Sequence, residues 1–359
     1  MKNIKRKHGL VLIHVIVLLM GSCGGIFLPH APQDDLSVSA RDLNAADTSL
    51  NIVAANTIIQ DVVESVTGTE VAVIVSGAED PHSYEPTSSE VSALDEADVI
   101  FRLGLDHIEP WWETEWEDAV VKGLVSDDML LEDPLLEEDG EEAHAAAEEV
   151  HQYNPHVWMD PNHVIEFTNT VEKTMVSQDS SNADTYEKNA ASYRGVLYDL
   201  LNDIEDAKKD FSGLKVVINH PAFLYLFELL EIERIATVEK GEGKEPSADD
   251  IASIIDKMNE QDVNLIIADP QHESQNVYEI ARSTNSKIAL LTSLLNVEVT
   301  WDGEQKVITT YKQMIEYDLW ALANPEDPPS IFASWWIFLL IGIPIVAVIV
   351  VLFIMRRRD

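Results

Sequence analysis

The sequence predicts an α/β protein with two βα lobes that contain parallel sheets, a long central helix that joins them, and a C-terminal transmembrane helix. Two observations predict the lobes and their link. Short runs rich in Val, Ile and Ala alternate with amphipathic stretches, and one long amphipathic stretch, from Ala183 to Asp210, interrupts this alternation. A third observation predicts the membrane helix, because no charged residue occurs from Ile331 to Met355. Strands separated by helices form βαβ units, so the sheets are expected to be parallel.

The first lobe alternates strands with helices before the central stretch. In Thr57–Thr67, for example, Ile58, Ile59, Val62 and Val66 share one helical face. The predicted strands are Asn51–Ala55, Glu70–Val75 and Val99–Leu103, and the other predicted helices are Ser88–Glu96 and Asn162–Val176.

The same alternation resumes after the central helix. The predicted strands are Lys215–Asn219, Arg234–Val238, Asn264–Ala268 and Lys287–Leu291, and the predicted helices are Phe223–Leu230, Ala248–Glu260 and Lys306–Ala323. Open parallel sheets bind their ligands at the carboxyl ends of the strands, and clefts between lobes are favoured sites.

These patterns divide the chain into six segments. They are a signal peptide at 1–23, a tether at 24–49, an N-terminal lobe at 51–181, a linking helix at 182–210, a C-terminal lobe at 211–323 and a transmembrane anchor at 331–355. The N-terminal lobe includes an acidic loop at 131–153, where Asp and Glu crowd around His144 and His151 without an apolar period.

Both ends of the chain carry membrane signals. Basic residues among the first seven precede the apolar run Leu10–Met20 and then small residues, which is the plan of a secretory signal. Cys23 follows the small residues as in a lipoprotein-processing site, although Met20 fits imperfectly, so lipidation stays open. The run at 331–355 is long enough to cross a bilayer, and the arginines Arg356–Arg358 place the C-terminus in the cytoplasm. We therefore expect a membrane-anchored body at the cell surface.

Composition narrows the possible partners. The formal net charge of -40 opposes binding to nucleic acid or anionic lipid. Hydrophobic residues make up 46% of the chain, enough for a substantial core. The single cysteine, Cys23, excludes a disulfide framework and a thiolate metal site within the chain.

Three of the 11 histidines share one setting, a turn or strand end beside a proline. His82 lies in DPHSYEPT after the second strand, His156 in NPHVWMDP after the acidic loop, and His220 in NHPAFLYLF at the end of the strand that opens the second lobe. A zinc site needs three or four ligands, and imidazole is the commonest of them. Two histidines from one lobe and one from the other predict a metal site between the lobes.

These segments resemble those of the solute-binding proteins of metal-importing ABC transporters, the zinc- and manganese-binding cluster. The resemblance spans about residues 51–323, and a fourth segment, IIADPQHES, matches in the same order. It implies that His82, His156 and His220 bind a divalent transition metal, which passes to an ABC permease subunit. It also implies a transport role without enzymatic activity, and it places Asp269 at an acidic position of the family.

The fourth ligand is left open by the sequence. Many relatives have a late Asp, but Leu291–Asn296 contains no carboxylate. Water, Asp269 or a side chain of the acidic loop remain as candidates, and Asp160 is a candidate carboxylate for orienting an imidazole. Three imidazoles and water favour zinc, whereas a carboxylate-rich set would favour manganese. His144 and His151 are candidates for weak metal gathering, and the alternative is a loop that is merely solvated.

Two other functions use the same features. Three histidines with a bound water suit a zinc hydrolase, but the sequence contains neither an HExxH motif nor a nucleophile elbow. A surface adhesin on the same fold is the other alternative.

Overall fold

The computed structural model describes residues 44–329, except 47, 78, 107, 113–115, 117, 134, 136–152, 240–244 and 271–273. The predicted signal peptide, most of the tether and the acidic loop, His144 and His151 lie outside the described residues. So does the predicted transmembrane anchor at 331–355. Across the described ranges, no helix has both the length and the apolar character that crossing a membrane requires.

The first sheet has four parallel strands in the order β2-β1-β3-β4. Its strands are β1 (Ile52–Asn56), β2 (Ala72–Val75), β3 (Val99–Arg102) and β4 (Val120–Gly123). The associated helices are α1 (Thr57–Thr67), α2 (Ser88–Asp95) and α3 (Pro161–Gln178). Asn56 caps α1 by accepting a hydrogen bond from the Ile59 N–H, so the helix begins directly at the carboxyl end of β1.

The second sheet repeats this plan with the strand order β6-β5-β7-β8, again all parallel. Its strands are β5 (Lys215–Ile218), β6 (Glu233–Thr237), β7 (Leu265–Ala268) and β8 (Lys287–Leu290). The associated helices are α5 (Leu224–Leu230), α6 (Ala248–Glu260), α7 (Gln275–Thr284) and α8 (Tyr311–Ala323). In both sheets the first strand of the unit is an interior strand, and its carboxyl end leads straight into a helical segment.

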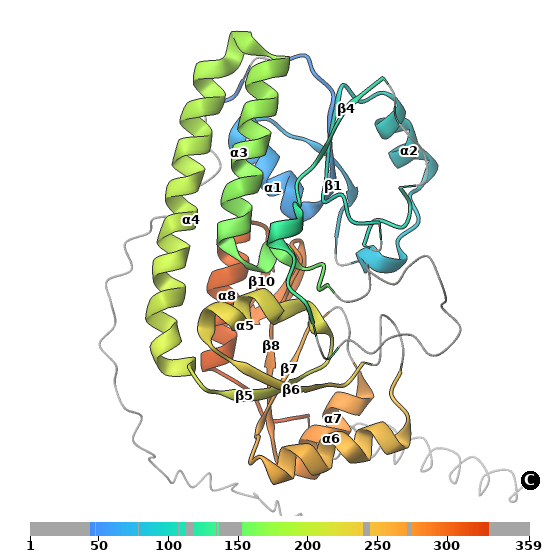
Figure 1. The fold of residues 1–359 in the computed structure, drawn as a ribbon, viewed down its shortest axis with the longest axis vertical. Helices are drawn as coiled ribbons and strands as arrows, with labels where there is room; N and C mark the ends of the chain where they lie inside the picture. Colours follow the sequence, from blue (N-terminus) through green and yellow to red (C-terminus); the bar gives the residue numbers. More distant parts are fainter. Residues whose placement is uncertain are drawn as a thin grey trace, which may run out of the picture. The chain divides into compact units, whose positions relative to one another are not determined.

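The long helix α4 (Ala183–Phe211) packs against elements of both sheets. It contacts α1 and α3 beside the first sheet, and α5 and α8 beside the second (Figure 1). Its 29 residues extend about 43 Å at the usual helical rise. One continuous apolar cluster runs from α1 through α4 to α5 and α8. The predicted α/β fold with parallel sheets and a long helix is confirmed.

The helix predicted at Lys306–Ala323 is wrong over its first five residues, which form the end of a strand and a two-residue connection to the helix. β9 (Val297–Trp301) and β10 (Glu304–Ile308) pair as an antiparallel hairpin. Asp302 and Gly303 form the turn with φ of 54° and 78°, the left-handed values that two-residue hairpin turns need. α8 begins only at Tyr311, where the Thr310 side chain accepts from the Gln313 N–H. The short strand β4 and the helix α7 are further elements that the sequence analysis did not predict.

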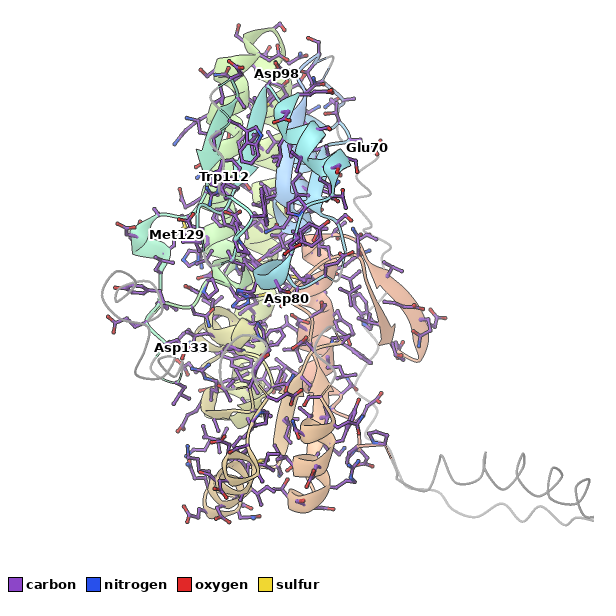
Figure 2. All side chains as sticks on the ribbon, turned by 90° about the vertical axis from the view of Figure 1, so that its right-hand side faces the viewer. Glu70, Asp80, Asp98, Trp112, Met129 and Asp133 are labelled. Atoms are coloured by element: carbon purple, nitrogen blue, oxygen red, sulfur yellow. The ribbon has the colours of Figure 1, made fainter. Side chains whose placement is uncertain are left out.

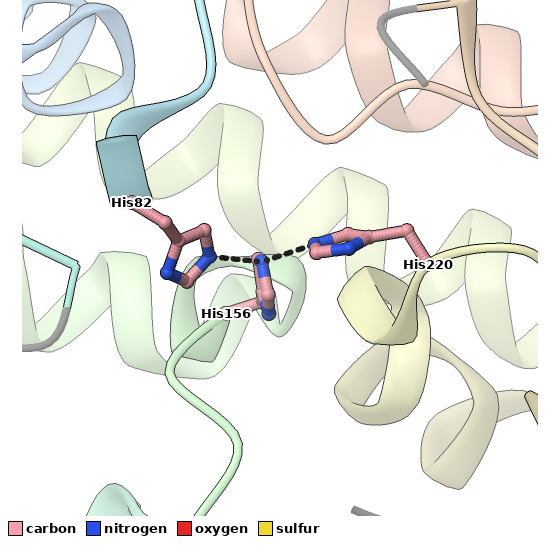
Figure 3. Close-up of side chains that lie close together, drawn as sticks. All are labelled: His82, His156 and His220. Carbon is pink, nitrogen blue, oxygen red and sulfur yellow. Dashed lines mark hydrogen bonds between the residues drawn. The ribbon is translucent and has the colours of Figure 1, made fainter. Parts of the chain in front are cut away.

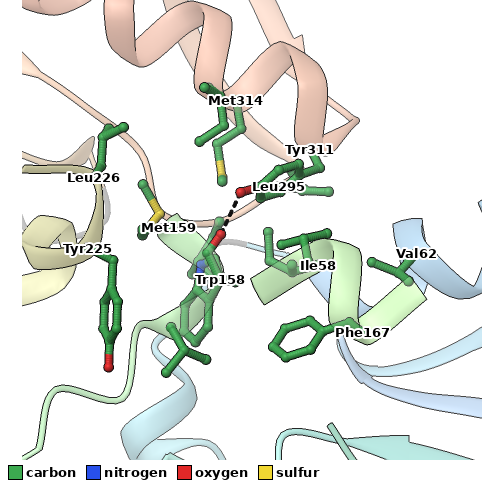
Figure 4. Close-up of a cluster of buried hydrophobic side chains, with 14 of the residues drawn as sticks. Ile58, Val62, Trp158, Met159, Phe167, Tyr225, Leu226, Leu295, Tyr311 and Met314 are labelled. Atoms are coloured by element: carbon green, nitrogen blue, oxygen red, sulfur yellow. Dashed lines mark hydrogen bonds between the residues drawn. The ribbon is translucent and has the colours of Figure 1, made fainter. Parts of the chain in front are cut away.

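Buried side chains hold the segment that follows His156 in the centre of the molecule (Figure 4). The Tyr311 hydroxyl donates to the Trp158 carbonyl at 2.6 Å, and the Trp158 indole donates to the Ser293 carbonyl at 2.7 Å. Trp158, Met159 and Tyr311 are almost fully buried. The loop between β8 and β9 and the start of α8 therefore fix the backbone at 157–159.

Asp61 makes the stability of this packing dependent on pH. Its carboxylate, on α1, accepts from the Tyr193 hydroxyl at 2.7 Å and from the Tyr311 N–H at 3.3 Å. Burial raises the pKa of Asp61 to about 6, because desolvation outweighs these hydrogen bonds. Asp61 therefore stays protonated in the folded protein at pH values where the unfolded chain has lost this proton, above about pH 4. The stability that the protonated side chain contributes is lost as the pH rises from about 4 to about 6.

We expect Asp61→Asn to remove the fall in stability that the ionisation of Asp61 causes as the pH rises. Thermal unfolding of both proteins, followed between about pH 4 and about pH 7, should show the variant gaining stability relative to the parent as the pH rises. A difference between the two melting temperatures that stays constant over this range would contradict the assignment.

Candidate metal centre

His82 lies on a one-turn helix, η2 (Pro81–Ser83), which follows β2. Pro81 opens the turn with its fixed φ, and the Asp80 side chain caps it by accepting from the His82 N–H at 2.9 Å. Ser83 also donates its hydroxyl to Asp80, at 3.1 Å. Figure 2 labels Asp80 at this turn. The cap fixes the backbone of His82 directly beyond the first sheet.

His156 is held by Asn154, two residues before it. The Asn154 Oδ1 accepts from the backbone N–H of His156 and lies 3.0 Å from the imidazole Nδ1. The Asn154 amide nitrogen lies 2.6 Å from the Pro221 carbonyl and 3.2 Å from Asp133, both acceptors. Because both acceptors bind the amide nitrogen, the amide oxygen of Asn154 is turned toward the imidazole. Nδ1 of His156 therefore donates to this oxygen, and Nε2 lies on the side of the ring away from Asn154.

His220 follows β5 and precedes the short helix η6 (Pro221–Phe223). Its Nδ1 lies 2.6 Å from Oε2 of Glu239, which lies two residues beyond the end of β6. A carboxylate only accepts, so Nδ1 carries the hydrogen and Nε2 is turned to the other side of the ring. The His220 side chain is almost fully buried, with 4% exposed.

The three imidazoles converge on one point (Figure 3). Nε2 of His156 lies 3.3 Å from Nε2 of His220 and 3.5 Å from Nε2 of His82. One ring nitrogen from each histidine lies within 4.8 Å of the others. Zinc–imidazole bonds of 2.0–2.1 Å in a tetrahedral site separate neighbouring nitrogens by about 3.3 Å. The observed spacings therefore match those of nitrogen ligands around one tetrahedral ion.

Two of the other predicted site residues, Asp269 and Asp160, are not members of this group. Among the described residues, the set with mutually close ligand atoms contains no carboxylate. Asp269 is buried directly after β7, and Asp160 caps α3 by accepting from the Asn162 N–H at 2.7 Å. The imidazole partners that the structure shows are instead Asn154 and Glu239. Sequence reasoning gave neither Asn154 nor Glu239 a role.

A buried ion pair supports Asn154 from behind. Arg234, on β6, pairs with Asp133, and both side chains are at most 5% exposed. Asp133 in turn accepts from Asn154. Figure 2 labels Asp133, which belongs to the described first residues of the acidic loop. The pair therefore connects the second sheet to the amide that orients His156.

The parallel sheets, the long helix and the convergence of three imidazoles define the class of the chain as that of substrate-binding proteins. The chain matches the family described as zinc-uptake complex component A, periplasmic, over residues 52–324. It belongs to this family, which is one of uptake components and not of enzymes.

Individual relatives differ in the metal that their names give. The chain is 25% identical to the zinc-binding lipoprotein AdcA of Streptococcus pneumoniae strain R6 over 319 residues, covering 87% of this chain and 61% of AdcA. It thus spans about three fifths of the length of AdcA. It is 26% identical to the manganese-binding lipoprotein MntA of Halalkalibacterium halodurans, covering 72% of this chain and 79% of MntA. A crystal structure of ZnuA has the same fold, with a TM-score of 0.64 at 22% identity over 77% of this chain and 99% of ZnuA.

The Asp133–Arg234 pair gives a test of how the centre is supported. We expect Asp133→Ala to lower the free energy of unfolding by about 3 kcal/mol or more, because it leaves the buried guanidinium of Arg234 without its carboxylate partner. Nε and Nη1 of Arg234 are already buried without a hydrogen bond to any described residue. Urea denaturation measures the change.

The neighbouring exposed residue supplies the matched control, Glu132→Ala, which should change stability little. The double variant Asp133→Leu/Arg234→Met, which removes both charges, is expected to recover part of the loss. Equal effects of Asp133→Ala and Glu132→Ala would refute the role of the pair.

Proposed function

We propose that this protein captures zinc at the cell surface through His82, His156 and His220 and delivers it to an ABC permease subunit. The convergence of the three Nε2 atoms carries the proposal, because its 3.3 and 3.5 Å spacings suit one tetrahedral ion. Membership in an uptake family supports the transport role. Names of relatives support a metal cargo and an ABC transporter as the partner.

The chemistry of the ligands favours zinc over manganese. Imidazole nitrogen suits zinc, whereas manganese favours carboxylate oxygen and lies lower in the order of divalent affinities. The close group of ligand atoms among the described residues consists of three histidines alone. We propose that water takes the fourth position and that Asp269 is a second candidate for it.

The arrangement of the chain fits delivery at a membrane. We propose lobes at 51–181 and 211–323 with the linking helix at 182–210, so that the metal lies where residues from both lobes meet. A signal peptide at 1–23, a tether at 24–49 and an anchor at 331–355 would keep the body outside the cell, with the C-terminus in the cytoplasm. Loop residues His144 and His151 would gather metal weakly beside the site.

Calorimetric titration of the chelator-treated protein tests the proposal. We expect one zinc ion per chain, bound more tightly than manganese. His82→Ala and His220→Ala should each weaken zinc binding by more than about 100-fold, the upper range for residues that only support a ligand. Loss of a direct ligand is expected to exceed that range.

His163→Ala is the matched control. His163 is also half-buried, but its Nδ1 lies 2.9 Å from the Val157 carbonyl, and it is not part of the three-histidine group. Its removal should leave zinc affinity nearly unchanged. Absence of zinc binding by the parent protein would overturn the proposal, and metal-dependent turnover of ester or peptide substrates would favour the hydrolase instead.

A further inference from the structure

We propose that Glu239 is a positioning residue for the metal site: it turns Nε2 of His220 toward the bound ion and supplies negative charge behind that ligand. The inference rests on the proposed function and adds a determinant of its affinity. It concerns a residue beyond the three histidines and beyond the acidic positions that the sequence suggested.

The contact is short and largely shielded from water. Oε2 of Glu239 lies 2.6 Å from Nδ1 of His220, and the two side chains are 13% and 4% exposed. A hydrogen bond to a carboxylate is shorter and stronger than one between neutral groups. Low exposure strengthens it further, because little water screens the charge. The bond therefore holds both the tautomer and the rotation of the His220 ring.

Backbone hydrogen bonds place the two residues opposite each other. The Glu239 N–H donates to the Asn219 carbonyl at 3.0 Å, and the Val238 N–H donates to the Ile218 carbonyl at 2.8 Å. These bonds continue the parallel pairing of β5 with β6 to one residue beyond β5 and two residues beyond β6. Asn219 immediately precedes His220, so the sheet itself brings carboxylate and imidazole together, and the contact does not depend on a surface rotamer.

The carboxylate contributes charge without becoming a ligand. It binds Nδ1, on the far side of the ring from the Nε2 that faces the other histidines. His156 receives the same kind of support from a neutral amide, Asn154. A dication held by three neutral imidazoles in a buried place gains from a nearby anion, and a carboxylate partner also makes an imidazole a more basic ligand. Of the two side chains that orient an imidazole through Nδ1, Asn154 is neutral and Glu239 is anionic.

Zinc affinity of Glu239→Gln, measured by competition with a chromophoric chelator, tests the charge. Glutamine keeps the length and an acceptor oxygen but loses the anion. We expect zinc binding to weaken by about 10- to 100-fold. Glu233→Gln is the matched control, because it makes the same change at an exposed position of β6, the strand that leads to Glu239, beside Lys215. Its affinity should equal that of the parent protein.

The orientation of the ring is tested separately by nitrogen-15 NMR of the His220 side chain in the metal-free protein. The parent is expected to show hydrogen on Nδ1, and Glu239→Ala is expected to populate the tautomer with hydrogen on Nε2. A purely structural role would leave the tautomer unchanged.

Each result decides the inference. Zinc affinity of Glu239→Gln within error of the parent, or an unchanged tautomer in Glu239→Ala, would overturn it. Should Glu239→Gln not fold, Glu239→Asp replaces it in the affinity measurement, with weaker zinc binding expected because the shorter side chain does not reach Nδ1. Failure of the parent protein to bind zinc would instead overturn the proposed function, so the two failures are distinguishable.

Discussion

Three imidazole nitrogens held 3.3 and 3.5 Å apart in a largely buried place set the constraint on which the rest of the structure depends. The surroundings of the three rings hold these nitrogens at a spacing that suits one tetrahedral ion. The three histidines come from segments that follow strands of two different sheets and from the segment before α3. A continuous core along α4 joins these parts.

Each part of that support has a local cause. Asp80 fixes the turn that carries His82, whereas Asn154 and Glu239 fix the rings of His156 and His220. The buried Asp133–Arg234 pair then fixes Asn154. Hydrogen bonds to Nδ1 leave Nε2 as the atom that faces the common point. The site is therefore built in its binding geometry, which reduces the ordering that a bound ion would have to impose.

The sequence predicted the parallel sheets and the long helix because the underlying signals are periodic and local. It also singled out the three histidines, since each lies beside a proline at the end of an element. The role of Glu239 could not be predicted from the sequence, because its contact with His220 depends on the register of β6 against β5, and no local pattern encodes that register. The hairpin at Val297–Ile308 was missed although its Asp-Gly turn signal is present. There the helical pattern of the following segment was extended too far toward the N-terminus.

In this protein, the attraction of cations and the choice between metal ions depend on different groups. A formal charge of -40 attracts any cation to the surface, and such long-range attraction does not distinguish zinc from calcium or magnesium. Short-range ligand chemistry does distinguish them, because imidazole suits zinc and the hard cations need oxygen. A carboxylate at the site would add attraction but also offer oxygen to the wrong ions. With Glu239 behind His220 this conflict would be avoided, since its charge would act on a bound ion while its Oε2 is hydrogen-bonded to the ring.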